Sequence, residues 1–163
     1  MGKRQKHKRT NQSQTLRLME RESQQPIGIE IPKGDSREDI KARKQIISDF
    51  YAKWMAKNPD KRVWNQSLND YIYVKFHSIN ETKGHASGTY ESTKVLFELS
   101  KILERAALEE EKPQKKGDNN QKIFSKMLIM RYKHIKLTVG YQPSKGQYVQ
   151  YCITVPGTRM HKK

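Results

Sequence analysis

Residues 121–156, QKIFSKMLIMRYKHIKLTVGYQPSKGQYVQYCITVP, carry the clearest structural signal in the chain. Two runs in this stretch alternate apolar and polar residues, which is the pattern of a strand with one buried face. The apolar positions are Ile135, Leu137, Val139 and Tyr141, and then Val149, Tyr151, Ile153 and Val155. The intervening QPSKG has the length and composition of a hairpin loop, and residues 123–131 are a third apolar run. We therefore predict a three-stranded antiparallel meander.

The same alternation predicts a polar face on the other side of the sheet. In the meander this face would carry His134, Lys136, Thr138, Tyr148, Gln150, Cys152 and Thr154. Residues 71–78 alternate likewise and predict a fourth strand. Its apolar side would hold Ile72, Val74 and Phe76, and its polar side Tyr71, Tyr73, Lys75 and His77. One face of the sheet therefore needs a cover of helices, and the other faces solvent.

Two segments are expected to be those helices. Ser36 followed by Asp39 resembles a capping box, and Pro59 would stop the helix that starts there. A second helix is expected over residues 92–108, with Ser92 or Thr93 as its N-cap and a frayed end at residues 109–111. Residues 63–70, 80–91 and 111–121 are expected to be loops. The predicted fold is an α+β domain over residues 35–157, with a four-stranded antiparallel sheet and two helices on one face.

Composition predicts a basic, modest-sized domain with polar arms. The 163 residues hold 33 Lys and Arg against 17 Asp and Glu, a net charge of +16, and 34% are apolar. Residues 1–34 are expected to be a disordered basic arm and residues 158–163 a basic tail, acting as salt-dependent phosphate-binding arms or as plain solubilising segments. No apolar run approaches a membrane span of roughly 18 residues, and the N-terminal basic residues precede no apolar signal core. With Cys152 as the only cysteine, we expect a cytoplasmic protein without an intrachain disulfide.

The polar sheet face has the chemistry of a nucleic-acid surface. Lys and Arg can meet phosphates, and unpaired bases stack on Tyr and His with about 1–3 kcal/mol per base. The expected nucleic-acid-binding residues are Tyr73, Lys75, Lys83, Arg131, Lys133, Lys136 and Tyr148. The alternative interpretation is an ordinary solvated antiparallel face, where Lys, Thr and Tyr are common. The excess of positive charge, which attracts polyanions in general, favours binding over this alternative, and the expected partner is RNA or single-stranded DNA.

Histidines suggest a second function. His77, His85 and His134 are the candidate acids and bases of a metal-independent ribonuclease, with Lys83 or Lys136 stabilising the charge on the phosphorane. The segment ETKGHAS concentrates such residues within residues 81–87. The alternative is a helix-initiating loop in which Glu81 and Ser87 satisfy local backbone donors.

No motif for a cofactor or a metal is visible. The five histidines show no HxH or HExxH spacing, and there is no P-loop, GxGxxG or GxSxG motif. We expect no cofactor and no metal. Cys152 alternates with Tyr151 and Ile153 inside a strand, which favours a structural cysteine over a nucleophile.

The order of the segments IYVKFHSI, KVLFELSKILERA and MLIMRYKHIKLTVGYQPSKGQYVQYCITV resembles the large polyvalent protein-associated domains of phages and mobile elements, and among them the third family. The resemblance spans residues 65–156. It implies a small α+β module, similar in shape to the barnase, EndoU, colicin and RelE nucleases, and a bacterial or phage source. It implies no complete catalytic set: His77, His85, Lys133 and His134 are residues of suitable type only.

Three functions follow as hypotheses. The first is a nucleic-acid-binding module for RNA or single-stranded DNA. The second is a metal-independent ribonuclease or toxin. The third is a structural or adaptor protein that docks on an acidic protein partner. None of the three requires a membrane.

Overall fold

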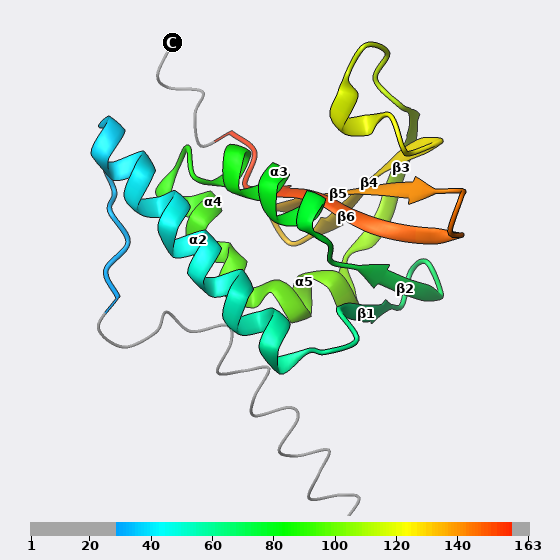
Figure 1. Cartoon of the computed structure of the whole chain (residues 1–163), viewed down its shortest axis with the longest axis horizontal. Helices are drawn as coiled ribbons and strands as arrows, with labels where there is room; N and C mark the ends of the chain where they lie inside the picture. Colours follow the sequence, from blue (N-terminus) through cyan, green and yellow to red (C-terminus); the bar gives the residue numbers. More distant parts are fainter. Residues whose placement is uncertain (1–28, 158–163) are drawn as a thin grey trace, which may run out of the picture.

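The three strands of the C-terminal meander form where the sequence predicts them. In the computed structural model, which describes residues 29–157, its strands are β4 (Lys126–Tyr132), β5 (Ile135–Gln142) and β6 (Gln147–Thr154). Successive strands pair antiparallel, and the β5–β6 hairpin turns over residues 143–146. The meander supplies the middle of the sheet (Figure 1).

The sheet is larger than expected and is mixed. Its strand order is β1-β2-β6-β5-β4-β3, which makes six strands instead of four. The additional strands are β1 (Arg62–Asn65) and β3 (Ala107–Pro113), while β2 (Asp70–Tyr73) is a shortened form of the expected fourth strand. β2 pairs parallel with β6 through only two residue pairs, and the other pairings are antiparallel. The α+β class is therefore confirmed, and the four-stranded antiparallel sheet is wrong.

β3 replaces the frayed helix end that we expected at residues 109–111. These glutamates lie on an edge strand whose backbone pairs with β4. Glu109 forms an ion pair with Arg131, and Glu111 forms one with Lys126 at 2.7 Å. Exposed pairs of this kind contribute only about 0–1 kcal/mol each, so the backbone pairing with β4 decides the conformation. Tertiary pairing has overridden the helical pattern of the preceding residues.

Helix α2 (Arg37–Lys57) agrees with the sequence prediction. The Ser36 hydroxyl accepts a 3.0 Å hydrogen bond from the Asp39 backbone N–H, which caps the helix as expected. Ile47, Tyr51 and Trp54 of its apolar stripe are buried. They pack in the main core of the domain, which lies between the helices and the sheet.

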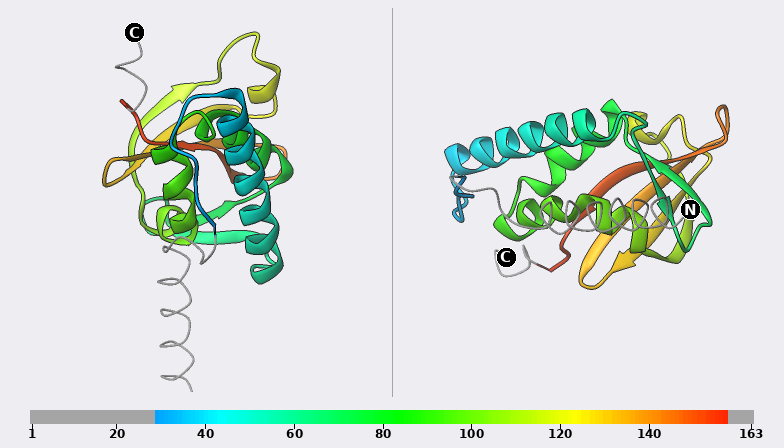
Figure 2. Two further views of the ribbon diagram at one scale, coloured as in Figure 1. Left: turned by 90° about the vertical axis from the view of Figure 1, so that its left-hand side faces the viewer. Right: turned by 90° about the horizontal axis from the view of Figure 1, so that it is seen from below.

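The second helical segment is broken into short pieces. It consists of α4 (Tyr90–Val95), the single 3-10 turn η1 (Leu96–Glu98) and α5 (Leu99–Arg105). Its N-cap is Thr89 and not Ser92 or Thr93. Figure 2 shows this segment beside α2 on one side of the sheet, where Trp54 donates a hydrogen bond to Ser100. Within residues 29–157, no helix is long and apolar enough to cross a membrane.

Helix α3 (Phe76–Ala86) occupies residues that we expected to be strand and loop. The strand ends at Tyr73. Val74 is buried as expected, but Phe76, which was expected on the same apolar side, is 76% exposed. The Lys75 backbone N–H donates to the Ser78 hydroxyl, which starts the helix. Ser78, Thr82 and Ala86 are buried and form a stripe of small side chains that brings α3 close to β6 (Figure 1).

The N-terminal part of the described chain packs earlier than residue 35. Ile31 is buried, and the carbonyls of Pro32 and Gly34 accept hydrogen bonds from the buried Arg43 guanidinium. Packing against α2 therefore begins before residue 35, where the domain was expected to start. Residues 1–28 and 158–163, which hold most of the expected arm and the tail, lie outside the described residues.

Candidate functional site

A β-bulge in β6 decides which side chains reach the outer face, by which we mean the sheet face turned away from α2 and α5. Thr138 pairs with Cys152, but its neighbour Val139 pairs with Gln150, so Tyr151 is an extra residue in the strand. An extra residue reverses the alternation of side chains beyond it. Two residues on either side of Tyr151 that strict alternation would put on the same face therefore lie on opposite faces of the sheet.

Tyr148 and Gln150 consequently lie on the helix-facing side, contrary to the prediction. The Tyr148 ring packs 5.0 Å from the Tyr141 ring, and Gln150 is fully buried. Val149, expected in the main core, turns outward instead. Lys136 and Tyr148 thus lie on opposite faces. The continuous surface of cations and aromatic rings that the strict alternation predicts does not form.

The outer face of the meander consists of three cross-strand rows, set by the register of β4, β5 and β6. The first row is Arg131, Lys136 and Thr154. The second row is Ile129, Thr138 and Cys152, and the third is Met127, Gly140 and Val149. The rows change from cationic to apolar along the strands, so only one end of this face suits an anion.

Phe124 covers the apolar row. Its ring lies so close to Gly140 that a Cβ on that residue would be 2.5 Å from the ring. Phe124 is itself buried and stands edge-on to the rings of His77 and Tyr151. The chain therefore covers part of the surface that we expected to be open. What remains is one region over the first two rows and another on β1 and β2.

An open groove of about 590 Å³ lies over the first two rows. Its floor is the sheet, and residues 112–121, from the end of β3 through the segment that leads to β4, form much of its wall. The lining residues are His85, Lys112, Pro113, Gln114, Lys115, Asp118, Gln121, Met127, Ile129, Lys136, Thr138, Tyr151, Cys152 and Thr154. Three of them are lysines, and Asp118 is the one carboxylate among these described residues. The groove is thus cationic with a partly apolar floor.

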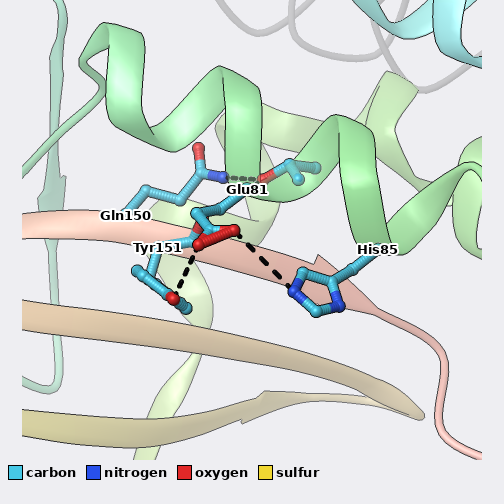
Figure 3. A network of polar contacts seen from close by, with 5 residues as sticks. Glu81, His85, Gln150 and Tyr151 are labelled. Carbon is cyan, nitrogen blue, oxygen red and sulfur yellow. Dashed lines mark hydrogen bonds and ion pairs between the residues drawn. The ribbon is translucent and has the colours of Figure 1, made fainter. Parts of the chain in front are cut away.

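Glu81 organises one end of the groove (Figure 3). Its carboxylate accepts a 2.7 Å hydrogen bond from the Tyr151 hydroxyl. The same carboxylate lies 3.8 Å from Nε2 of His85, one turn further along α3. Burial, followed by the hydrogen bond to Glu81, raises the pKa of Tyr151, so its phenol remains a donor at neutral pH. The Glu81 carboxylate is thereby held beside a histidine whose side chain is 55% exposed.

Buried polar contacts fix this end of the groove to the core. The Gln150 amide donates a 2.5 Å hydrogen bond to the Thr82 hydroxyl, and both residues are fully buried (Figure 3). The Tyr51 hydroxyl donates to Gln150 Oε1 at 3.1 Å. The bulge thus connects α2 and α3 to β6, and a satisfied buried network of this kind favours one arrangement of the helices.

Cys152 lies on the floor of the groove. Burial raises the pKa of its thiol to about 11, although Lys136 acts in the opposite direction. At neutral pH the thiol is therefore protonated and is a poor nucleophile. Within the described residues, no three His, Cys, Asp or Glu side chains are grouped so that they could hold a metal ion.

The expected histidines do not converge. His85 lines the groove, whereas His77 packs against Phe124 and Tyr151, and His134 is exposed in the turn between β4 and β5. Each therefore has a different environment. These positions do not bring two of the three histidines to one phosphate.

The expected cations and aromatic residues are divided among several places. Lys136 lines the groove, and Arg131 is its cross-strand neighbour, paired with Glu109. Lys133 adjoins this row in the β4–β5 turn, where its ammonium group lies 5.2 Å from the Tyr132 ring. Lys83 lies on α3. Tyr73 and Lys75 belong to the β2 side of the sheet, beyond Phe124.

Sequence reasoning missed several residues of the groove. Lys112 and Lys115 were assigned to a plain solvated loop, and Tyr151 to the core. Glu81 and His85 offered a usable signal, because a spacing of four places two side chains on one face of a helix. That signal was lost because residues 80–91 were expected to be a loop. Nothing in the local sequence indicates that Lys112 and Lys115 line the same groove as Lys136.

Comparison with known families identifies the chain. The family model for large polyvalent protein-associated domain 3 matches residues 39–142, from the first turn of α2 to the end of β5. The chain belongs to this family, which confirms the resemblance seen in the sequence. No curated protein and no solved structure matches the chain. The likeness to the barnase and RelE nucleases stays a prediction.

Proposed function

We propose that this protein binds single-stranded nucleic acid, RNA or DNA, with phosphates of the strand in the groove. One observation supports the proposal above the others. Lys112 on β3, Lys115 in the following loop and Lys136 on β5 meet at one groove, together with His85 from α3. Segments far apart in the sequence thus direct cations to one place, which scattered surface lysines do not do.

The remaining lining residues suit the other parts of a nucleotide. Met127, Ile129 and Pro113 offer apolar surface to a sugar or base, and the hydroxyls of Thr138 and Thr154 can bond to phosphate oxygens. A volume of about 590 Å³ lies within the range of small-ligand sites. The net charge of +16 adds long-range attraction for polyanions.

The family context is compatible with this function. Large polyvalent protein-associated domains belong to proteins of phages and mobile elements, whose life cycles transfer nucleic acid. We propose a cytoplasmic location, in a bacterial or phage-infected cell. Its partner there would be RNA or DNA exposed as a single strand.

A gel-shift titration with a labelled single-stranded RNA in EDTA tests the proposal. The variant Lys112→Gln/Lys136→Gln removes two groove cations and should weaken binding by about tenfold or more. The matched control is Lys44→Gln/Lys53→Gln, which removes two exposed charges from α2 on the other side of the sheet. The control should bind within about twofold of the wild type. Equal weakening of both variants would show charge attraction without a site and would contradict the proposal.

A second candidate is a metal-independent ribonuclease, and the pairing of Glu81 with His85 is the observation that favours it. In this reaction His85 would take the proton from a 2′-hydroxyl, whose oxygen then attacks the neighbouring phosphorus. A cyclic phosphate forms as the bond from phosphorus to the 5′-oxygen of the next nucleotide breaks, and that oxygen leaves with a proton taken from solvent water. Lys136 would stabilise the negative charge that develops on the phosphorane.

The same RNA, incubated for hours with the protein in EDTA, tests this second candidate. A ribonuclease should release fragments that end in a cyclic phosphate, and His85→Ala should abolish the cleavage. His134→Ala is the control, because His134 is exposed in a turn and does not line the groove. RNA that stays intact with the wild-type protein would leave binding as the function.

A further inference from the structure

A second group of aromatic and cationic side chains lies on β1, on β2 and at Lys75, just after β2, beyond Phe124. We call it the β1–β2 strip and define it as Trp64, Tyr71, Arg62, Tyr73 and Lys75. The register pairs Trp64 with Tyr71 and Arg62 with Tyr73. Tyr73 also pairs with Val149, which faces outward. The strip therefore belongs to the same outer face as the groove.

The strip is a continuous series of ring and cation contacts. The Trp64 and Tyr71 rings meet edge to face, with centroids 5.1 Å apart. The Arg62 guanidinium lies 3.9 Å from the centre of the Tyr71 ring and donates a 3.1 Å hydrogen bond to the Tyr73 hydroxyl. The Lys75 ammonium lies 5.9 Å from the centre of the Tyr73 ring. Neighbouring contacts thus hold each member in place.

The cationic end of the strip is anchored to the meander. Lys75 Nζ donates hydrogen bonds to the side-chain oxygens of Gln142 and Gln147, at 3.1 and 2.6 Å. Lys145 is close enough to help lower the pKa of Lys75, after the larger effect of burial. The negative charge of Asp60 attracts the Arg62 guanidinium. Cations therefore exceed carboxylates here.

Packing in the hydrophobic core does not account for Trp64. Its side chain is 43% exposed, whereas Trp54 is 1% exposed and hydrogen-bonded to Ser100. A large exposed ring next to a stacked guanidinium is a surface on which an unpaired base can stack, because both the ring and the guanidinium plane attract a base. Bases inside a duplex are already stacked on their neighbours, so their faces are not available to the Trp64 ring or the Arg62 guanidinium.

We propose that the β1–β2 strip is a stacking site for unpaired bases of the strand whose phosphates lie in the groove. This inference rests on the proposed function and makes it more specific. The ligand is a single strand, Trp64 and Arg62 stack its bases, and Lys75 meets its phosphates. Phe124 separates the two sites, so a strand that uses both crosses it.

Tryptophan fluorescence tests the strip directly, because Trp64 is exposed and Trp54 is buried. Titration with a single-stranded RNA should quench the emission of Trp64 and saturate at the same Kd as the gel shift. A duplex of the same sequence should give no comparable quenching. Trp64→Ala should weaken single-strand binding roughly tenfold, and Trp64→Phe should keep most of it, since a ring remains to stack.

The outcomes separate this inference from the proposed function. If the Lys112→Gln/Lys136→Gln variant binds weakly but Trp64→Ala binds as the wild type and Trp64 emission does not change, the strip is not a base-stacking site and the groove stands alone. Equal quenching by duplex and single strand would also overturn the inference. If the wild-type protein binds no single strand at all, both the function and the strip fail. Far-ultraviolet circular dichroism confirms that each variant is folded.

Discussion

The Tyr51 hydroxyl donates a 3.1 Å hydrogen bond to Gln150 in the core, although strict alternation of β6 would send Gln150 to the outer face. The bulge at Tyr151 makes this contact possible. Gln150 then donates its amide to Thr82 on α3. One buried amide thus links two helices to the strand that forms part of the groove.

Replacing Tyr51 with phenylalanine tests this link. Tyr51→Phe leaves the oxygen of Gln150 buried without its donor, which should lower the free energy of unfolding by about 1–3 kcal/mol. Urea denaturation at pH 7 measures the change. A variant as stable as the wild type would mean that the hydroxyl contributes nothing to the link.

The same residue predicts a loss of stability in alkali. Burial raises the pKa of Tyr51 to about 12, whereas the pKa of an ordinary tyrosine is 10.0. The folded state therefore favours the neutral phenol, so its contribution is fully present below pH 10 and is lost as the pH rises from 10 to about 12. Tyr51→Phe should show a smaller fall in unfolding free energy across this range than the wild type. Parallel falls in the two proteins would contradict the assignment.

Local signals were sufficient for the parts of the fold that local chemistry decides. The cap at Ser36, the stop near Pro59 and the alternation of β5 each act through residues close in sequence. The bulge is different, because the contact that holds Gln150 inside joins residues 99 positions apart. The alternation around Tyr151 carries no trace of it.

The misassigned elements have the same explanation. Residues 109–111 are extended because β4 offers an open edge, and α3 is a helix whose buried side consists of small residues such as Thr82. Neither has the apolar periodicity that sequence reading detects. Lys136 and His85 were named from their chemistry, and both line the groove. Lys112 and Lys115 could not be named, because their positions depend on the pairing of β3 with β4 and on the course of the loop that follows β3.

The close packing of Phe124 on Gly140 predicts that two glycine-to-alanine substitutions differ clearly in their effect on stability. Gly140→Ala places a methyl group 2.5 Å from the Phe124 ring, so the ring must move, and we expect a loss of about 1–3 kcal/mol. Gly84→Ala in α3 is the matched control, because nothing lies within 4 Å of its added methyl. That control should gain up to about 1 kcal/mol from the better helix propensity of alanine. Thermal denaturation of the two variants measures both, and equal Tm values would contradict the close packing of Phe124.

The hydrogen bonds of Arg43 predict that residues 32–34 contribute to the stability of the fold. Its guanidinium is fully buried and donates to the carbonyls of Pro32, Gly34, Ser87 and Gly88. Arg43→Met leaves these acceptors without their donor and should lower the unfolding free energy by about 3 kcal/mol or more. The control Arg37→Met, at an exposed position of the same helix, should change it by less than about 0.5 kcal/mol. Guanidinium-chloride titration of both variants measures the difference.

The salt dependence of single-strand binding tests the central claim most directly. For single strands, the slope of log K against log salt is about −0.7 for each phosphate neutralised, so Lys112→Gln/Lys136→Gln should make the slope less steep by about 1.4. Lys44→Gln/Lys53→Gln should keep the wild-type slope. A groove variant with the wild-type slope, or a wild-type protein whose affinity does not fall with salt, would contradict the claim that this groove holds the phosphates of a nucleic acid.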